Sequence, residues 1–118
     1  MRPNFFTNTP DINPHHCQDH DRPAFLVRTA LAALLSPSWG MYNGWELCEA
    51  KAVPGKEEYL DSEKYQYKTW DWNRPGHIKD WIRLLNEIRN AHPALQEWHD
   101  VRFIDCTDPE LLAFVKVK

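Results

Sequence analysis

The run AFLVRTALAALL, residues 24–35, decides the fold. It is apolar on almost every side of a helix, and Arg28 is its only charge. A helix of this kind is covered on more than one side, so we expect it inside a larger structure. Asp21 is placed to cap it, Pro23 suits its first turn, and Pro37 ends it.

Two short strand candidates flank this helix. Residues 4–7 form an apolar run between two prolines, and residues 39–42 form a second run that closes at Asn43-Gly44. Residues 8–21 are rich in Asn, Pro, Asp and His, so we expect a loop there. The order of strand, helix and strand predicts a parallel pair joined by a helical crossover.

A long connection, a second helix and a hairpin follow. Residues 45–75 form a connection far longer than most structureless loops, and their aromatic side chains argue against plain disorder. Apolar residues recur at helical spacing in residues 76–91, which predicts an amphipathic helix that stops at Pro93. Residues 101–104 and 111–115 have the composition of two strands and predict a hairpin.

Two parallel strands do not make an independent sheet, and the chain of 118 residues is less than half of the roughly 250 in a (β/α)8 barrel. We therefore expect an α/β fold. Residues 1–99 are predicted to form part of a (β/α)8 TIM barrel, namely its last two β/α units. Residues 100–118 are predicted to begin a β-sandwich domain with their hairpin.

Charge and hydropathy limit the kinds of partner. The chain has 14 Lys+Arg and 17 Asp+Glu, so its formal net charge is 14 − 17 = −3, and no basic patch indicates a nucleic-acid partner. No apolar run reaches the ~20 residues of a membrane span, and no signal peptide is apparent. Three cysteines lie far apart without a CxxC pair, which is typical of a reducing compartment. We expect a cytoplasmic protein without membrane or nucleic-acid partners.

Carboxylates and aromatic rings gather where the predicted strands end. The active site of a barrel lies at the carboxyl ends of its strands, and the first predicted strand leads directly to Asp11. An Asx-turn or a helix cap is an equally open role for this residue. The second strand leads to Glu46 and an acidic loop. Aromatic residues make up 13% of the chain, including six Trp. Carboxylates beside aromatic rings favour carbohydrate chemistry with an oxocarbenium-like transition state.

Several motifs carry a resemblance to a known family. They are residues 4–12 (NFFTNTPDI), 22–25 (RPAF), 44–49 (GWELCE), 54–65 (PGKEEYLDSEKY) and 70–76 (WDWNRPG). Together they resemble the alpha-amylase superfamily, glycoside hydrolase family 13, and within it the maltosyltransferases that use maltose 1-phosphate. The resemblance covers nearly the whole chain, and the run EEYLDSEKY is its most specific part.

The resemblance implies a retaining transfer of maltosyl from alpha-maltose 1-phosphate to an alpha-1,4-glucan, with release of phosphate, in glycogen-like glucan synthesis. By its motif, Asp11 takes the part of the transition-state stabiliser, and Lys64 and Tyr65 that of the substrate-binding pair. The family's nucleophilic aspartate and general-acid glutamate lie on earlier strands, so no carboxylate here inherits those roles. We therefore expect the chain alone to be inactive, and the full-length family member to be a homodimer.

The sequence departs from the family pattern at one place, and the resemblance implies no metal site. His20-Asp21 stands where the family pattern has Gly-Gly, which puts the shape of that loop in doubt. His16 and His20 share one face if this stretch is helical, a spacing that can bind zinc. No fourth ligand is indicated and the related enzymes need no metal, so we expect neither a metal nor a cofactor.

Two other functions stay open. A non-catalytic carbohydrate-binding fragment would use aromatic rings as a platform, and the candidates are Tyr65, Tyr67, Trp70 and Trp72. A sister glycosidase of the same superfamily is the other alternative, and Lys64-Tyr65 argues against it. The acidic run of residues 57–63 is expected to shape the entrance of the active site, with a solvated acidic face as the alternative.

Overall fold

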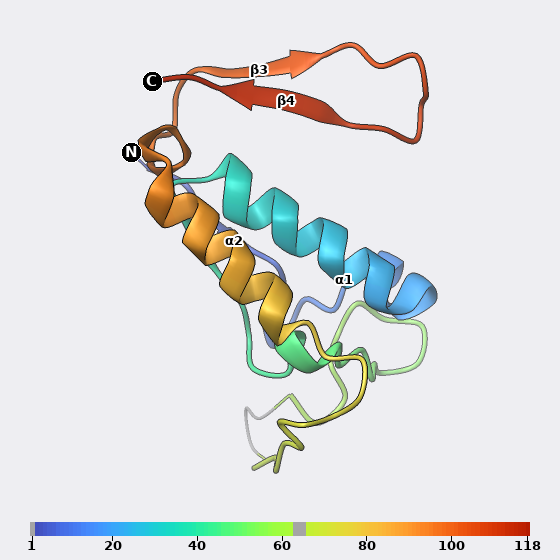
Figure 1. Ribbon diagram of the computed structural model, residues 1–118. Coiled ribbons are helices and arrows are strands. Elements are labelled where there is room, and N and C mark those ends of the chain that lie inside the picture. The colour runs from blue at the N-terminus through green and yellow to red at the C-terminus, as the bar shows by residue number, and fades with distance from the viewer. Residues whose placement is uncertain (1, 63–65) are drawn as a thin grey trace.

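The structure, a computed structural model, describes residues 2–62 and 66–118 (Figure 1). Two helices lie side by side, and an antiparallel hairpin near the C-terminus lies above them in the view of Figure 1. A second, parallel pair of strands is formed near the N-terminus. In chain order the elements are β1 (Asn4–Phe6), α1 (His15–Leu35), β2 (Ser38–Gly40), η1 (Trp45–Leu47), α2 (Lys79–Ala91), η2 (Pro93–Gln96), β3 (Val101–Ile104) and β4 (Ala113–Lys116). The fold is therefore a small α/β arrangement with two separate two-stranded sheets.

The first sheet is the parallel pair that the sequence predicts. Phe5 of β1 is opposite Trp39 of β2, and helix α1 forms the crossover between the two strands. Ser36 is fully buried after the helix, and its hydroxyl donates to the carbonyl of Pro3 at 2.8 Å. This bond holds the start of β2 beside the start of β1, so the carboxyl ends of both strands lie at the same edge.

Helix α1 begins earlier than expected. The prediction of a loop over residues 8–21 is wrong for its last part, because the helix starts at His15. Asp21 has non-helical backbone angles (φ 51°, ψ −145°) and breaks the helix in two. The second part follows this break with Pro23 in its first turn, as predicted. The first part depends on a distant cap, since the Glu57 carboxylate accepts from the His15 N–H at 3.0 Å.

Helix α2 packs against α1 and is tied to it by two side chains. Trp81 Nε1 donates to the Leu26 carbonyl at 3.0 Å. The Arg89 guanidinium donates to the carbonyls of Ala33, Ser36 and Pro37, and so satisfies orphan acceptors at the end of α1. Burial lowers the pKa of Arg89. The helix begins three residues later than predicted and reaches its predicted end.

The core lies between the two helices and η1. Trp45 and Phe25 are fully buried with ring centroids 4.4 Å apart, and Trp45 Nε1 donates to Thr29 Oγ1 at 2.7 Å. The other members of this cluster are Cys17, Ala24, Ile78 and Ile82. Trp45 comes from the predicted long connection, which therefore supplies a central core residue.

The second sheet is the predicted hairpin, and it lies across one end of the helices (Figure 1). Strand β3 has its predicted bounds, whereas β4 begins two residues later than predicted. Phe103 and Phe114 are opposite each other, and Phe103 is 63% exposed. The hairpin thus has an apolar surface that the described residues leave uncovered.

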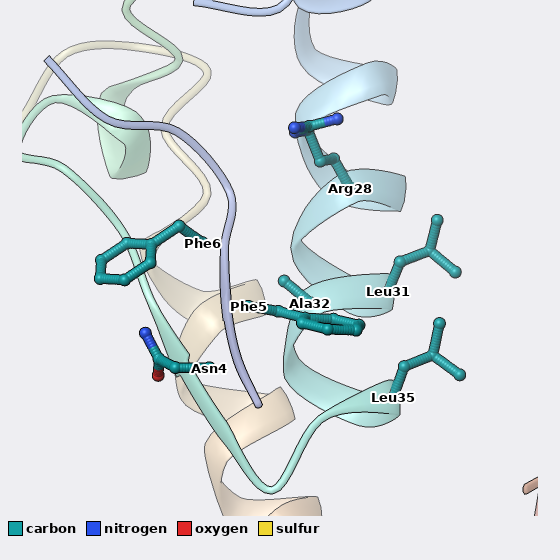
Figure 2. A pocket seen from close by; sticks show the side chains of 7 residues that line it. All are labelled: Asn4, Phe5, Phe6, Arg28, Leu31, Ala32 and Leu35. Carbon is teal, nitrogen blue, oxygen red and sulfur yellow. The ribbon is translucent and has the colours of Figure 1, made fainter. Parts of the chain in front are cut away.

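Helix α1 leaves one side uncovered within the described residues. Phe25, Thr29 and Ala33 are buried, whereas Val27 is 57% exposed. An apolar pocket of about 310 Å³ lies between β1 and α1, and Figure 2 shows the Phe5 ring beside Ala32 in it. Its lining residues are Asn4, Phe5, Phe6, Arg28, Leu31, Ala32 and Leu35. A second groove of about 460 Å³ runs between α1 and the hairpin. In the described part of the chain, no helix is long and apolar enough to cross a membrane.

We expect the purified chain to self-associate at micromolar concentration, because large apolar side chains of α1 and the hairpin, among them Val27, Phe103 and Leu111, are exposed. Size-exclusion chromatography with light scattering should give oligomers whose mass rises with concentration. Val27→Gln, at an exposed position of α1, should reduce that mass. A monomer with a sharp, cooperative thermal transition would contradict this expectation.

Candidate functional site

Asp11 lies at the tip of a tight turn that follows β1. Thr9 and Ile12 exchange two backbone hydrogen bonds of 3.1 and 3.0 Å, so the chain reverses over Pro10 and Asp11. Asp11 is exposed. The short, closed turn therefore gives this carboxylate a defined place at the carboxyl end of a parallel strand.

A pocket of about 270 Å³ opens beside this turn. Two further acidic residues, Glu58 and Asp61, line it together with Asp11. The remaining lining residues are Val53, Tyr59, Ser62 and Gln66. Three carboxylates around one small pocket can accept hydrogen bonds from several hydroxyl groups, and they create a negative potential that favours a positively charged transition state.

Asn8 ties this turn to two other segments. Its side chain is buried, its Oδ1 accepts from the Tyr42 N–H at 2.8 Å, and its Nδ2 donates to the Tyr59 hydroxyl at 2.9 Å. Tyr42 follows β2, so the ends of both parallel strands and the acidic loop meet at one amide. Burial raises the pKa of the Tyr59 phenol, and the hydrogen bond from Asn8 opposes this shift only in part.

The acidic loop is ordered by its own backbone and by the segment after Asp11. Ala52 and Tyr59 form an isolated antiparallel bridge. Asn13 is fully buried, its N–H donates to the Glu57 carbonyl at 3.0 Å, and its Nδ2 donates to the Ala50 carbonyl at 3.1 Å. Glu58 and Asp61 of the acidic run thus line the pocket of Asp11, whereas the Glu57 side chain caps α1. That this pocket belongs to the entrance of an active site stays a prediction.

The aromatic residues of residues 66–72 differ in exposure. Tyr67 is fully exposed and Trp72 is 46% exposed. Trp70 is half-buried, with Lys68 Nζ 5.4 Å from its ring centroid. A Cβ at Gly44 would come within 2.6 Å of the Trp70 ring, and Gly44 has φ +99°, so only glycine fits there. Tyr67 and Trp72 are therefore available for stacking, and Trp70 is a packing residue.

The histidine cluster is helical, and the rings of His16 and His20 lie next to each other, tilted by 47°. His16 and His20 have ring centroids 4.7 Å apart. Cys17 between them is buried in the core, and this burial raises its pKa to about 11. Within the residues that the structure describes, no group of three or more His, Cys, Asp or Glu side chains could hold a metal ion.

Comparison with known proteins agrees with the motifs of the sequence. The chain is 56% identical over 116 residues to the alpha-1,4-glucan:maltose-1-phosphate maltosyltransferase of Cereibacter sphaeroides. It is 54% identical over 115 residues to that of Pseudomonas aeruginosa, and 50% identical over 121 residues to maltosyltransferase 2 of Streptomyces coelicolor. Each match covers 98% of the chain. The chain is homologous to one segment of these maltosyltransferases. No protein-family model matches it.

The chain is much shorter than the relatives that it matches. It spans 20% of the length of the Cereibacter sphaeroides enzyme, 17% of that from Pseudomonas aeruginosa and 10% of that from Burkholderia pseudomallei. Lys64 and Tyr65, the predicted substrate-binding pair, lie outside the described residues, as does Glu63. Ser62 and Gln66, the described residues on either side, both line the pocket of Asp11.

Three residues near Asp11 were not singled out from the sequence. Asn8, Asn13 and Tyr59 are buried and join the turn of Asp11 to its neighbours. Asn8 lies in the motif of Asp11, and Tyr59 lies within EEYLDSEKY. Membership of these motifs is a sequence signal that could have identified both residues. Asn13 gives no such signal, because its partners are backbone carbonyls of a distant loop.

Proposed function

We propose that this segment serves a retaining maltosyltransferase, which transfers maltosyl from alpha-maltose 1-phosphate to an alpha-1,4-glucan and releases phosphate. Asp11 is the transition-state stabiliser of this reaction. One observation carries the proposal: the turn of Asp11 and the loop of EEYLDSEKY, two motifs far apart in sequence, line one pocket. The identity of 50–56% to maltosyltransferases over 98% of the chain supports the same assignment.

The proposed chemistry divides the work between this segment and the rest of the enzyme. A nucleophilic aspartate outside the segment attacks the anomeric carbon, the bond to phosphate breaks, and a maltosyl-enzyme forms. The 4-hydroxyl of the glucan then attacks that carbon, its proton passes to the general acid–base glutamate outside the segment, and the bond to the aspartate breaks. In both steps positive charge develops on the sugar ring, and Asp11 stabilises it while accepting hydrogen bonds from sugar hydroxyls.

The anionic donor needs a cation beside the pocket. Asp11, Glu58 and Asp61 would repel the phosphate of maltose 1-phosphate. We assign the compensating charge to Lys64, with the Tyr65 hydroxyl as a hydrogen-bond donor to the same phosphate. Ser62 and Gln66 support this assignment, because both flank the pair in sequence and line the pocket.

The proposed setting of the segment is the end of a (β/α)8 barrel. Residues 1–99 run from its seventh strand through its eighth helix, and residues 100–118 begin a β-sandwich domain. The parallel pairing of β1 with β2 across α1 supports this placement, as does the apolar surface beside β1 and α1. The complete enzyme is proposed to be a cytoplasmic homodimer.

A chimera tests the proposed function. The matched stretch of the Cereibacter sphaeroides enzyme is replaced by this chain, to which it is 56% identical. We expect phosphate release from maltose 1-phosphate in the presence of glycogen, close to the rate of the parent enzyme. The isolated chain should release none, because the nucleophile and the general acid are supplied by the other part. Phosphate release by the isolated chain, or a folded but inactive chimera, would refute the proposal.

Lys64→Ala in the same chimera separates a phosphosugar enzyme from a sister glycosidase. It should raise KM for maltose 1-phosphate selectively, with little change in KM for glycogen. Equal changes in both would favour the glycosidase alternative.

A carbohydrate-binding function of the chain by itself is the second candidate, since Tyr67 and Trp72 are exposed on one loop. Titration of the isolated chain with maltooligosaccharide, followed by tryptophan fluorescence, distinguishes it. A saturable change that Trp72→Ala abolishes would establish this second function.

A further inference from the structure

Asn8 lies two residues beyond the end of β1, and its side-chain amide is buried. It is 1% exposed and takes part in four hydrogen bonds. Its Oδ1 accepts from Thr7 Oγ1 at 3.0 Å and from the Tyr42 N–H at 2.8 Å. Its Nδ2 donates to the Tyr59 hydroxyl at 2.9 Å and, at 3.5 Å, to the Tyr42 carbonyl. A fully paired buried amide adds little net stability but fixes its partners in one geometry.

Tyr59 extends this geometry from Asn8 to the pocket. It is 3% exposed, yet it lines the pocket of Asp11 together with Glu58 and Asp61. Its ring packs edge-on against Tyr42 at 5.7 Å, and the bridge with Ala52 fixes its backbone. The Tyr59 side chain is thus fixed at its backbone by the bridge and at its hydroxyl by the hydrogen bond from Asn8.

Asp11 comes three residues after Asn8, and the backbone between them is conformationally restricted. The two hydrogen bonds between Thr9 and Ile12 close the turn, and Pro10 has a fixed φ. A shift of Asn8 would therefore move the whole turn. On the far side, Asn13 holds the turn to the carbonyls of Glu57 and Ala50.

We propose that Asn8 and Tyr59 are positioning residues for Asp11: their buried hydrogen bond sets the distance between the turn that carries Asp11 and the loop of residues 57–62. This inference rests on the proposed function, because it concerns how Asp11 meets the reacting sugar. A carboxylate that stabilises a transition state loses much of its effect when it is misplaced by an ångström. The hydrogen bond thus acts on turnover through Asp11.

A double-mutant cycle in the chimera tests this. Tyr59→Phe removes the hydroxyl and keeps the ring, so we expect kcat to fall about tenfold, with KM for maltose 1-phosphate within about twofold. In the background of Asp11→Asn, the same change should leave the residual kcat unaltered. A merely structural role of Tyr59 would lower kcat by the same factor in both backgrounds, and that result would overturn the inference.

Two further outcomes keep the inference and the proposed function apart. If Asp11→Asn itself leaves kcat unchanged, the proposed function fails, whatever Tyr59→Phe does. If Asp11→Asn lowers kcat and Tyr59→Phe does not, only the positioning role fails. Thr7→Val is the second variant should Tyr59→Phe not fold: it removes the bond to Asn8 Oδ1, and the same pattern in the cycle is expected.

Discussion

Asp11→Asn in the chimera is expected to lower kcat for maltosyl transfer by a factor on the order of 10²–10³. The amide has the shape of the carboxylate but not its charge, so it cannot stabilise the positive charge that develops on the sugar ring. KM for maltose 1-phosphate should change far less, because the missing interaction is strongest in the transition state. Steady-state release of phosphate measures both quantities.

Asp80→Asn is the matched control for this prediction. Asp80 is on the surface of α2, where its exposed carboxylate pairs with Arg83 at 3.5 Å. Exposed pairs of this kind contribute little, so kcat should stay within about twofold of the parent. Equal losses in the two variants would show that Asp11 has no special part in the reaction.

Trp45→Ala should remove a large part of the stability of the chain. Trp45 is fully buried against Phe25 and donates its indole N–H to Thr29. Truncation of a buried Trp costs about 3–5 kcal/mol through lost burial and the cavity that remains, against roughly 5–15 kcal/mol for a whole domain. Urea unfolding, at a concentration where dilution no longer moves the midpoint, measures the loss.

Trp72→Ala makes the same substitution at an exposed position. Trp72 is 46% exposed and is outside the core cluster, so its removal should change the free energy of unfolding by less than about 0.5–1 kcal/mol. Similar midpoints for the two alanine variants would mean that the interface of η1 with α1 is not the core of this chain.

The secondary structure could be predicted where a single segment decides it. The parallel strands, the second part of α1, α2 and the hairpin follow from apolar periodicity and from Pro37 and Pro93. The first turns of α1 could not be predicted, because their caps are remote in sequence. Glu57 accepts from the N–H of His15, and Gln18 donates to the carbonyl of Lys56.

The charged residues of the candidate site could be predicted from the sequence, whereas the buried hydrogen bonds that hold them in place could not. Asp11 and the acidic loop are conspicuous because carboxylates after a strand point to chemistry. For Asn8 the only signal in the sequence is its place in a motif beside Asp11, and for Asn13 there is none, although both are buried. Their partners Tyr59 and Ala50 are distant in sequence, so only the folded chain shows these hydrogen bonds.

Within the described residues, β1 and β2 pair only with each other, so each strand has one unpaired edge. This has a consequence for the folding of the chain in the cell. The outer backbone N–H and C=O groups of such strands are a template for any extended polypeptide nearby. If the proposed barrel supplies strands to these edges, we expect the segment to bind chaperones until those strands pair with it. Made without them, it should be degraded faster, so its level in the cell would depend on the supply of strand partners.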